Sequence, residues 1–299
     1  MNATASRTPD AHTAIGNPVI AAIRDVRDGT PLPWVNVSGL PRYPSGDAHP
    51  GINQLALWVA QRQRGYRSSF WGSYSGWRGR GGQVRRDQRG TRVAHFERTR
   101  ATSGRTSGAG WTLRLKSIFN AEQVDGIEYP MADAAPELGD DNRFAGLALA
   151  LDTIVERQAI TLQCKGVEAF YDPGHDAIRM PYAAYFSTLS GRCVSARRAA
   201  LLANQCVRWT GHASRLDRCA PRIVRNRAAF ESLVADIGAA FVCAQLGFPY
   251  AGVETDVHDL QRWVNVVKSD PRVLFEAARC ASRACDYLLA CATPARSAA

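Results

Sequence analysis

Positive charge is concentrated in one short part of this sequence, at a density that a hydrophobic core cannot accommodate. Between Arg62 and Arg100 there are eleven arginines and only two acidic residues, Asp87 and Glu97. This segment therefore carries nearly all of the formal net charge of +10. Because such a cluster repels itself, it predicts a solvent-facing surface that usually carries an anion.

Aromatic rings are interleaved with these arginines, at Tyr66, Phe70, Trp71, Tyr74 and Trp77. Rings can stack on unpaired bases while guanidinium groups follow the phosphate backbone, which favours single strands over duplexes. The alternative is that the rings fill a core and the arginines form a solvated rim. Only three of the 37 basic residues are lysines, a bias that codon usage would also explain. The glycines include no G-x-x-x-x-G-K-[ST] motif, so nucleotide hydrolysis is not predicted.

Composition changes between Met131 and Arg143, where Pro136, Gly139 and several acidic residues indicate a linker. We predict a first domain over residues 1–130, a linker over 131–143 and a second domain over 144–299. The fold class expected is α+β, with a mixed α/β domain followed by a mainly helical domain that contains a small β-sheet or hairpin.

Apolar periodicity predicts the individual elements. In the first domain it indicates helices ending near Gly29 and Gly65, and strands over 91–96 and 111–119. In the second domain it indicates a helix over 144–157 and a hairpin over 167–180 around the turn Asp172 to Asp176. Further helices are expected over 199–209, 228–246, 257–267 and 271–289.

The eight cysteines contain no C-x-x-C pair and lie mostly in apolar helical patterns, as expected of reduced core residues in a cytosolic protein. The amino terminus lacks a basic start followed by an apolar run, and no stretch approaches the ~18 apolar residues of a membrane span. We therefore expect a cytoplasmic protein with no membrane partner.

The first domain contains a series of short motifs that match a known family. They are the helix Pro18 to Gly29 with Pro33-Trp34, Gly51-Ile52-Asn53, Gly65-Tyr66, Gly81 to Arg85, Arg89 to Val93 and Phe119 to Gln123. With these motifs the domain resembles the amino-terminal domain of ArdC-type antirestriction proteins of conjugative plasmids, which TraC-type plasmid primases share. In that family the domain binds single-stranded DNA, as the charge and the rings also suggest. The residues expected to contact the strand are Trp34, Asn53, Arg64, Tyr66, Arg67, Trp71, Trp77, Arg85, Arg86, Arg89 and Arg92.

The same family has a zincin-like second domain whose signature is His-Glu-x-x-His, then Trp-Thr-Gly-His, then Arg-Leu. Here Asn204-Gln205-Cys206-Val207-Arg208 precedes Trp209-Thr210-Gly211-His212, and Arg215-Leu216 follows. A zincin needs two imidazoles one helical turn apart to hold Zn²⁺, and a carboxylate to take a proton from the bound water. Asn204 is a weak ligand, Gln205 cannot accept that proton, and Arg208 brings a positive charge towards the metal.

The resemblance places the family's acidic metal residue at Asp236. The degenerate site is therefore expected to comprise Asn204, Gln205, Arg208, His212 and Asp236, with no metal, no catalytic residue and no cofactor. We predict that an Arg208–Asp236 ion pair occupies the vacated position. The alternative is a relocated zinc site that uses His212, His175 or His258 with Asp236.

The function expected is sequence-tolerant binding of single-stranded DNA that protects incoming plasmid DNA from host restriction. The second domain would be a scaffold, with a host protein as a possible partner. The main alternative is a metal-dependent peptidase with a rearranged metal site. A third reading is a decayed relic or a regulator that binds duplex DNA, although no helix-turn-helix is recognisable.

Overall fold

The structure is a computed structural model that describes residues 10–26, 31–35, 39–98, 111–131, 141–187, 194–251 and 257–290. Within these residues, the amino-terminal half contains three α-helices, five strands and the short 3-10 helix η1 (Ala121–Gln123). The helices are α1 (Ala11–Arg24), α2 (Gly51–Arg64) and the short α3 (Tyr74–Arg78). The strands are β1 (Trp71–Gly72), β2 (Gln83–Val84), β3 (Thr91–Arg98), β4 (Trp111–Asn120) and β5 (Val124–Asp125).

Strands β3 and β4 form a long antiparallel ribbon, with Thr91 opposite Ile118 and Arg98 opposite Trp111. Both strands were predicted, whereas residues 99–110, which connect them, lie outside the described part of the chain. Strand β1 pairs with the other edge of β4, so that the sheet order is β1-β4-β3. Strands β2 and β5 pair separately. The predicted end of α2 at Gly65 is confirmed, since this residue caps the helix with a left-handed φ of 70°.

The carboxy-terminal half is mainly helical, as predicted, and carries one three-stranded sheet. Its helices are α4 (Asp141–Arg157), α5 (Ala183–Ser187), α6 (Val194–Trp209), α7 (Arg227–Gln245), α8 (Val257–Ser269) and α9 (Arg272–Ala290). The predicted hairpin is formed by β7 (Phe170–Asp172) and β8 (Ala177–Met180). Strand β6 (Thr161–Cys164), which was not predicted, runs parallel to β8 on its other side.

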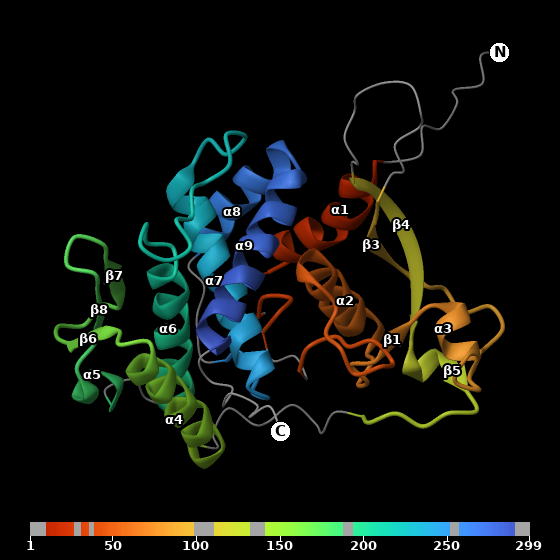
Figure 1. The fold of residues 1–299 in the computed structure, drawn as a ribbon, viewed down its shortest axis with the longest axis horizontal. Coiled ribbons are helices and arrows are strands. Elements are labelled where there is room, and N and C mark those ends of the chain that lie inside the picture. Colours follow the sequence, from red (N-terminus) through yellow and green to blue (C-terminus); the bar gives the residue numbers. More distant parts are fainter. Residues whose placement is uncertain are drawn as a thin grey trace, which may run out of the picture.

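The two halves share one hydrophobic core. Helices α1 and α2 pack against α8 and α9, and the ring centroids of Trp58 and Phe241 lie 5.5 Å apart across the junction. Figure 1 shows the amino-terminal half at one end, α7, α8 and α9 in the centre, and β6 to β8 at the opposite end. The domain boundary stays a prediction, because residues 132–140 of the linker lie outside the described part of the chain.

Helix α7 is the centre of this core. By length and composition alone it could span a membrane, but 78% of its most apolar 18-residue stretch is buried inside the fold. A helix that is apolar on all sides is expected at the middle of a packed core.

Among the described residues, four cysteines are buried free thiols, namely Cys206, Cys243, Cys280 and Cys285, whereas Cys193 and Cys291 lie outside the described part of the chain. The prediction of core cysteines was wrong for Cys164 and Cys219, which are exposed free thiols. Cys164 lies on the edge strand β6, where the sheet ends and no further layer covers the side chain.

Candidate nucleic-acid interface and altered metallopeptidase site

Three tryptophans that the sequence assigned to DNA are instead core residues. Trp34, Trp71 and Trp77 have no exposed surface. Trp71 packs edge to face on the half-buried Tyr66, with ring centroids 5.7 Å apart. Trp77 donates its indole N–H to the carbonyl of Phe119 at 3.0 Å. A ring without an exposed face cannot stack on a base, so the stacking role predicted for these three residues was wrong.

Asn53 is also structural. Its side chain is 2% exposed, donates to the carbonyl of Ala94 at 2.9 Å and accepts from the N–H of Ala94 at 2.7 Å. Strand β3 is an edge strand, so these backbone groups have no neighbouring strand. The amide of Asn53 satisfies them and fastens the ribbon to α2, which corrects its assignment as a DNA contact.

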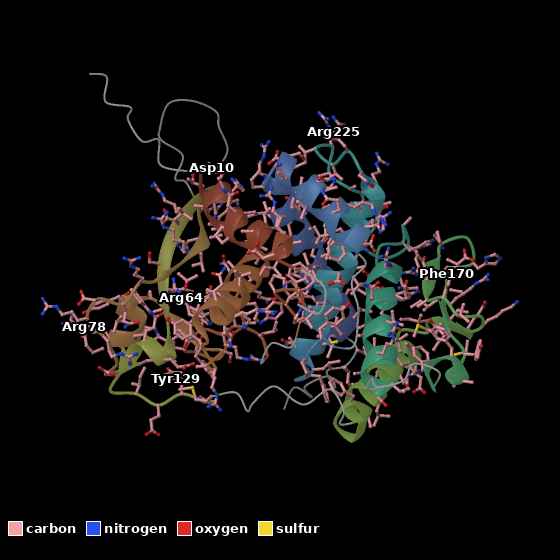
Figure 2. The ribbon with its side chains drawn as sticks, turned by 180° about the vertical axis from the view of Figure 1, so that it is seen from behind. Asp10, Arg64, Arg78, Tyr129, Phe170 and Arg225 are labelled. Carbon is pink, nitrogen blue, oxygen red and sulfur yellow. The ribbon has the colours of Figure 1, made fainter. Side chains whose placement is uncertain are left out.

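The arginines predicted to bind DNA are exposed, but they differ in how far the protein already pairs them. Arg64 donates to the carbonyl of Arg89 at 2.7 Å. Arg85 forms an ion pair with Asp125 at 3.2 Å and also donates to the carbonyl of Glu122. Figure 2 shows Arg64 and Arg78 on the amino-terminal half, and Arg225 on the other half. That these exposed arginines contact DNA stays a prediction; they are Arg64, Arg67, Arg85, Arg86, Arg89 and Arg92.

Other rings are exposed in this half. Tyr74 is 46% exposed, Phe96 51% and Trp111 69%. Phe96 and Trp111 lie near the end of the β3–β4 ribbon at which residues 99–110 connect the two strands, and Trp111 there pairs with Arg98. The alternation of Trp111 with Leu113 and Leu115 predicted a half-buried strand, but only the two leucines pack on the core. The alternation places these three residues on one face of β4, but it does not show how far along the strand the core extends.

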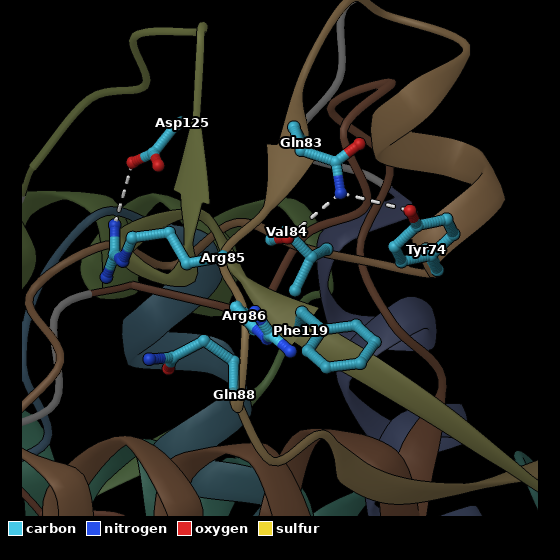
Figure 3. Close-up of a pocket in the computed structure, with 8 residues that line it drawn as sticks. All are labelled: Tyr74, Gln83, Val84, Arg85, Arg86, Gln88, Phe119 and Asp125. Carbon is cyan, nitrogen blue, oxygen red and sulfur yellow. Dashed lines mark hydrogen bonds and ion pairs between the residues drawn. The ribbon is translucent and has the colours of Figure 1, made fainter.

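An open pocket of about 820 Å³ lies between α3, β2 and β4. Figure 3 shows the eight residues that line it, including Tyr74, Gln83, Arg86, Gln88 and Phe119. Because β2 alternates, Val84 is buried while Gln83 and Arg85 face solvent. Gln83 donates to the hydroxyl of Tyr74 at 3.0 Å, which fixes the ring against the pocket wall. The sequence prediction missed Gln83, Gln88 and Phe119, of which only Gln83 could have been indicated by an alternation, that of exposed Gln83 with buried Val84.

Arg86 differs from its neighbour Arg85 in this pocket. Within the described part of the chain, the guanidinium of Arg86 makes no hydrogen bond or ion pair. The amide nitrogen of Gln88 likewise donates to no described residue, while its oxygen accepts from Gln123 at 3.0 Å. The pocket therefore presents a cation and an amide donor that are available to a ligand.

In the second half, α6 carries the altered signature. Asn204 and Arg208 lie one turn apart, and Nε of Arg208 donates to Oδ1 of Asn204 at 3.1 Å. Gln205 donates to the same oxygen at 3.1 Å. Burial lowers the pKa of Arg208, although the nearby carboxylates of Glu231 and Asp236 oppose this shift.

Asp236 is 4% exposed, and residues other than Arg208 satisfy its oxygens. The indole N–H of Trp34 donates to Oδ1 at 2.7 Å, and the hydroxyl of Tyr250 donates to Oδ2 at 3.1 Å. Burial raises the pKa of Asp236 to about 6, against the opposing effects of these hydrogen bonds and of the charge on Arg208. The predicted Arg208–Asp236 ion pair was wrong, because the two charges interact only at longer range.

The residues at this position do not fit a zinc ion. Zinc sites use imidazole, thiolate or carboxylate ligands, and here Asn204, Gln205 and Arg208 supply two amides and a cation. The relocated site is also contradicted, because the described residues contain no group of three or more His, Cys, Asp or Glu side chains that could hold a metal. His212 instead accepts from the hydroxyl or N–H of Ser214, and His175 contacts Asp172 at 2.9 Å.

The segment after the altered signature is held by ion pairs. Arg215 forms a two-pronged pair with Asp176, with N–O distances of 2.6 and 2.9 Å, and lies 3.8 Å from the ring centroid of Trp209. The Arg215 guanidinium lowers the pKa of Asp176 to about 2. Arg218 pairs with Glu231 at 2.9 Å. The first pair fastens the turn between β7 and β8 to the segment that follows α6, and the second joins this segment to α7.

Comparison with known proteins agrees with both halves of this description. Residues 9–128 match the family described as the N-terminal domain of anti-restriction factor ArdC. Residues 149–280 match the zincin-like metallopeptidase family. The crystal structure of the antirestriction ArdC protein from the R388 plasmid, in its metal-free form, is 30% identical to this chain, covers 95% of this chain and 98% of its own, and superposes with a TM-score of 0.75. The chain belongs to the ArdC antirestriction family.

A second crystal structure and two further protein sequences are also similar to this chain. The Mn(II)-bound structure of the R388 protein, also 30% identical, has a TM-score of 0.73 and covers 96% of this chain and 100% of its own. Protein y4eC of Sinorhizobium fredii is 27% identical over 95% of this chain and 94% of its own. The DNA primase TraC of Escherichia coli is 27% identical over 84% of this chain, which corresponds to only 18% of the primase. The resemblance inferred from the sequence motifs is thereby confirmed.

Proposed function

We propose that this ArdC-family protein binds single-stranded DNA with little sequence preference through its amino-terminal half, and so protects incoming plasmid DNA from host restriction. The observation that carries the proposal is the guanidinium of Arg86, which has no partner among the described residues and lies in an open pocket that also exposes the ring of Tyr74. A cation for the backbone beside a ring for the base is the combination that single strands require. The similarity to TraC primases, which act on DNA, supports the same reading.

The second half acts as a scaffold in this proposal. Its altered signature lacks the imidazoles and the carboxylate that a metallopeptidase needs. Its helices instead form the core on which α1 and α2 rest. The scaffold thus sets the position of the binding half without a chemical step of its own.

The proposal is tested by fluorescence anisotropy with labelled single-stranded and double-stranded oligonucleotides of the same sequence, at two salt concentrations. We expect tighter binding to the single strand, and affinity that falls with salt because bound phosphates release counterions. A preference for the duplex, or affinity that does not depend on salt, would contradict it.

A further inference from the structure

We propose that the pocket between α3, β2 and β4 receives a single unstacked nucleobase of the bound strand. This inference rests on the proposed function, and it specifies which part of the DNA strand enters the pocket. Its volume of about 820 Å³ lies within the range of ~300–1,000 Å³ that is usual for small ligands. A duplex could not enter it, since the bases of a duplex are stacked and paired.

The walls of the pocket offer an aromatic face. Tyr74 is 46% exposed, and its hydroxyl is tied to Gln83 at 3.0 Å, so the ring is held in one orientation before any ligand arrives. Phe119 lines the same pocket from β4, where its carbonyl is fixed by the indole of Trp77. Rings that are already immobilised lose little conformational entropy when a base stacks on them.

The polar groups of the pocket match the remaining parts of a nucleotide. The Arg86 guanidinium has no partner among the described residues, so it is available to a phosphate oxygen. The amide nitrogen of Gln88 and the amide oxygen of Gln83 make no hydrogen bond within the described chain, and they offer one donor and one acceptor to the edge of a base. A side-chain amide can form hydrogen bonds with more than one of the four bases, as expected of a protein with little sequence preference.

Asp125 restricts the phosphate contact to one of two adjacent arginines. This carboxylate lines the pocket and pairs with Arg85 at 3.2 Å, which neutralises that guanidinium. A second phosphate beside Arg85 would be repelled by Asp125. The pocket therefore accepts one base and one phosphate, and the neighbouring nucleotides extend along the surface outside it.

The experiment compares a labelled oligothymidine with an abasic oligonucleotide of the same length and phosphate number. The full-length protein, Tyr74→Ala and Tyr74→Phe are each titrated with both strands. We expect the unmodified protein to bind the intact strand at least about fivefold more tightly than the abasic strand, because a stacked base contributes about 1–3 kcal/mol. Tyr74→Ala should remove this difference and leave the abasic affinity unchanged, whereas Tyr74→Phe should retain it.

Arg225→Ala is the matched control, since Arg225 is exposed on the other half of the molecule. Denaturant midpoints establish that Tyr74→Ala remains folded, which its partial exposure predicts. The pocket proposal is overturned if the unmodified protein binds the intact and abasic strands equally, or if Tyr74→Ala keeps the whole preference for the intact strand. Either result leaves single-strand binding in place. Failure of the unmodified protein to bind either strand overturns the proposed function and the pocket proposal together.

Discussion

The indole N–H of Trp34 donates to Oδ1 of Asp236 at 2.7 Å, which joins two buried residues that are 202 positions apart in the sequence. Trp34 belongs to the half that was expected to bind DNA, and Asp236 to the altered metallopeptidase site. Both residues therefore serve the junction between the halves. Trp34 is packed into the shared core at this junction, so it has no face left for a base.

Replacing Trp34 by Phe removes this hydrogen bond and keeps most of the apolar volume. The buried carboxylate of Asp236 then loses one of its two neutral donors, and an unsatisfied buried group costs about 1–3 kcal/mol. We expect the free energy of unfolding in urea to fall by that amount, with unchanged affinity of the folded protein for single-stranded DNA. Lost affinity at unchanged stability would show that Trp34 contacts the strand.

Asp236 also predicts how stability depends on pH. Its pKa of about 6 in the folded protein lies above the ordinary value of 3.8. Between these two values the folded state holds a proton that the unfolded chain has released, so this group makes the folded state less stable as pH rises from about 4 to about 6. Asp236→Asn should remove this contribution, and urea midpoints measured across that range report it. An identical pH profile in the variant would argue against the raised pKa.

The Arg215–Asp176 pair should matter more than the surface pairs. The side chain of Arg215 is 7% exposed, and its loss would leave Asp176 without its two-pronged partner. Arg215→Met should lower the unfolding free energy by about 1–2 kcal/mol, less than for a fully buried pair, because Asp176 is 43% exposed and water can solvate its charge once the partner is lost. Arg262→Ala is the control, because the Arg262–Asp259 pair is exposed and worth less than about 1 kcal/mol. Equal losses in the two variants would contradict this ranking.

The Arg215–Asp176 pair also predicts how stability changes at acid pH. Because Asp176 has a pKa of about 2 in the folded protein, below its ordinary 3.8, its contribution is fully present above about pH 4 and disappears as pH falls towards 2. The stability difference between the unmodified protein and Arg215→Met should shrink over that interval. Thermal denaturation at a series of pH values measures it, and a constant difference would refute the assignment.

Restoring the signature should create metal binding. Asn204 and Arg208 lie one turn apart on α6, the spacing that two zinc-binding imidazoles require. Asn204→His, Gln205→Glu and Arg208→His combined should bind stoichiometric Zn²⁺, whereas the unmodified protein purified without chelator should contain none. Elemental analysis measures both. No uptake by the triple variant would count against the equivalence of these positions with the signature of active zincins.

Arg86 and Arg85 should differ in the salt dependence of DNA binding. Arg86 has no described protein partner, so Arg86→Ala should lower the salt slope by about 0.7, which corresponds to one phosphate contact on a single strand. Arg85 already pairs with Asp125, so Arg85→Ala should change the slope less. Titrations at four or more salt concentrations give the slopes, and a larger effect of Arg85→Ala would reverse the assignment.

Much of the fold could be predicted locally. The turn Asp172 to Asp176 predicted the β7–β8 hairpin, and Gly65 predicted the end of α2, because these residues restrict the backbone where they stand. The parallel strand β6 was missed, since its partner β8 is reached only through another strand. In the candidate site, the exposure of the arginines followed from their charge, whereas the burial of the tryptophans did not follow from their neighbours.

The sequence by itself determined that the basic segment must face solvent and that the metal signature lacks its ligands, because both follow from the chemistry of the side chains present. Only the tertiary structure decided which rings remain exposed and which groups remain unpaired. Tyr74 and Trp77 lie three residues apart in α3, yet one faces the pocket and the other the core. The burial of Trp77 depends on Phe119 and Tyr129, which lie more than forty residues away, and no local pattern encodes such contacts.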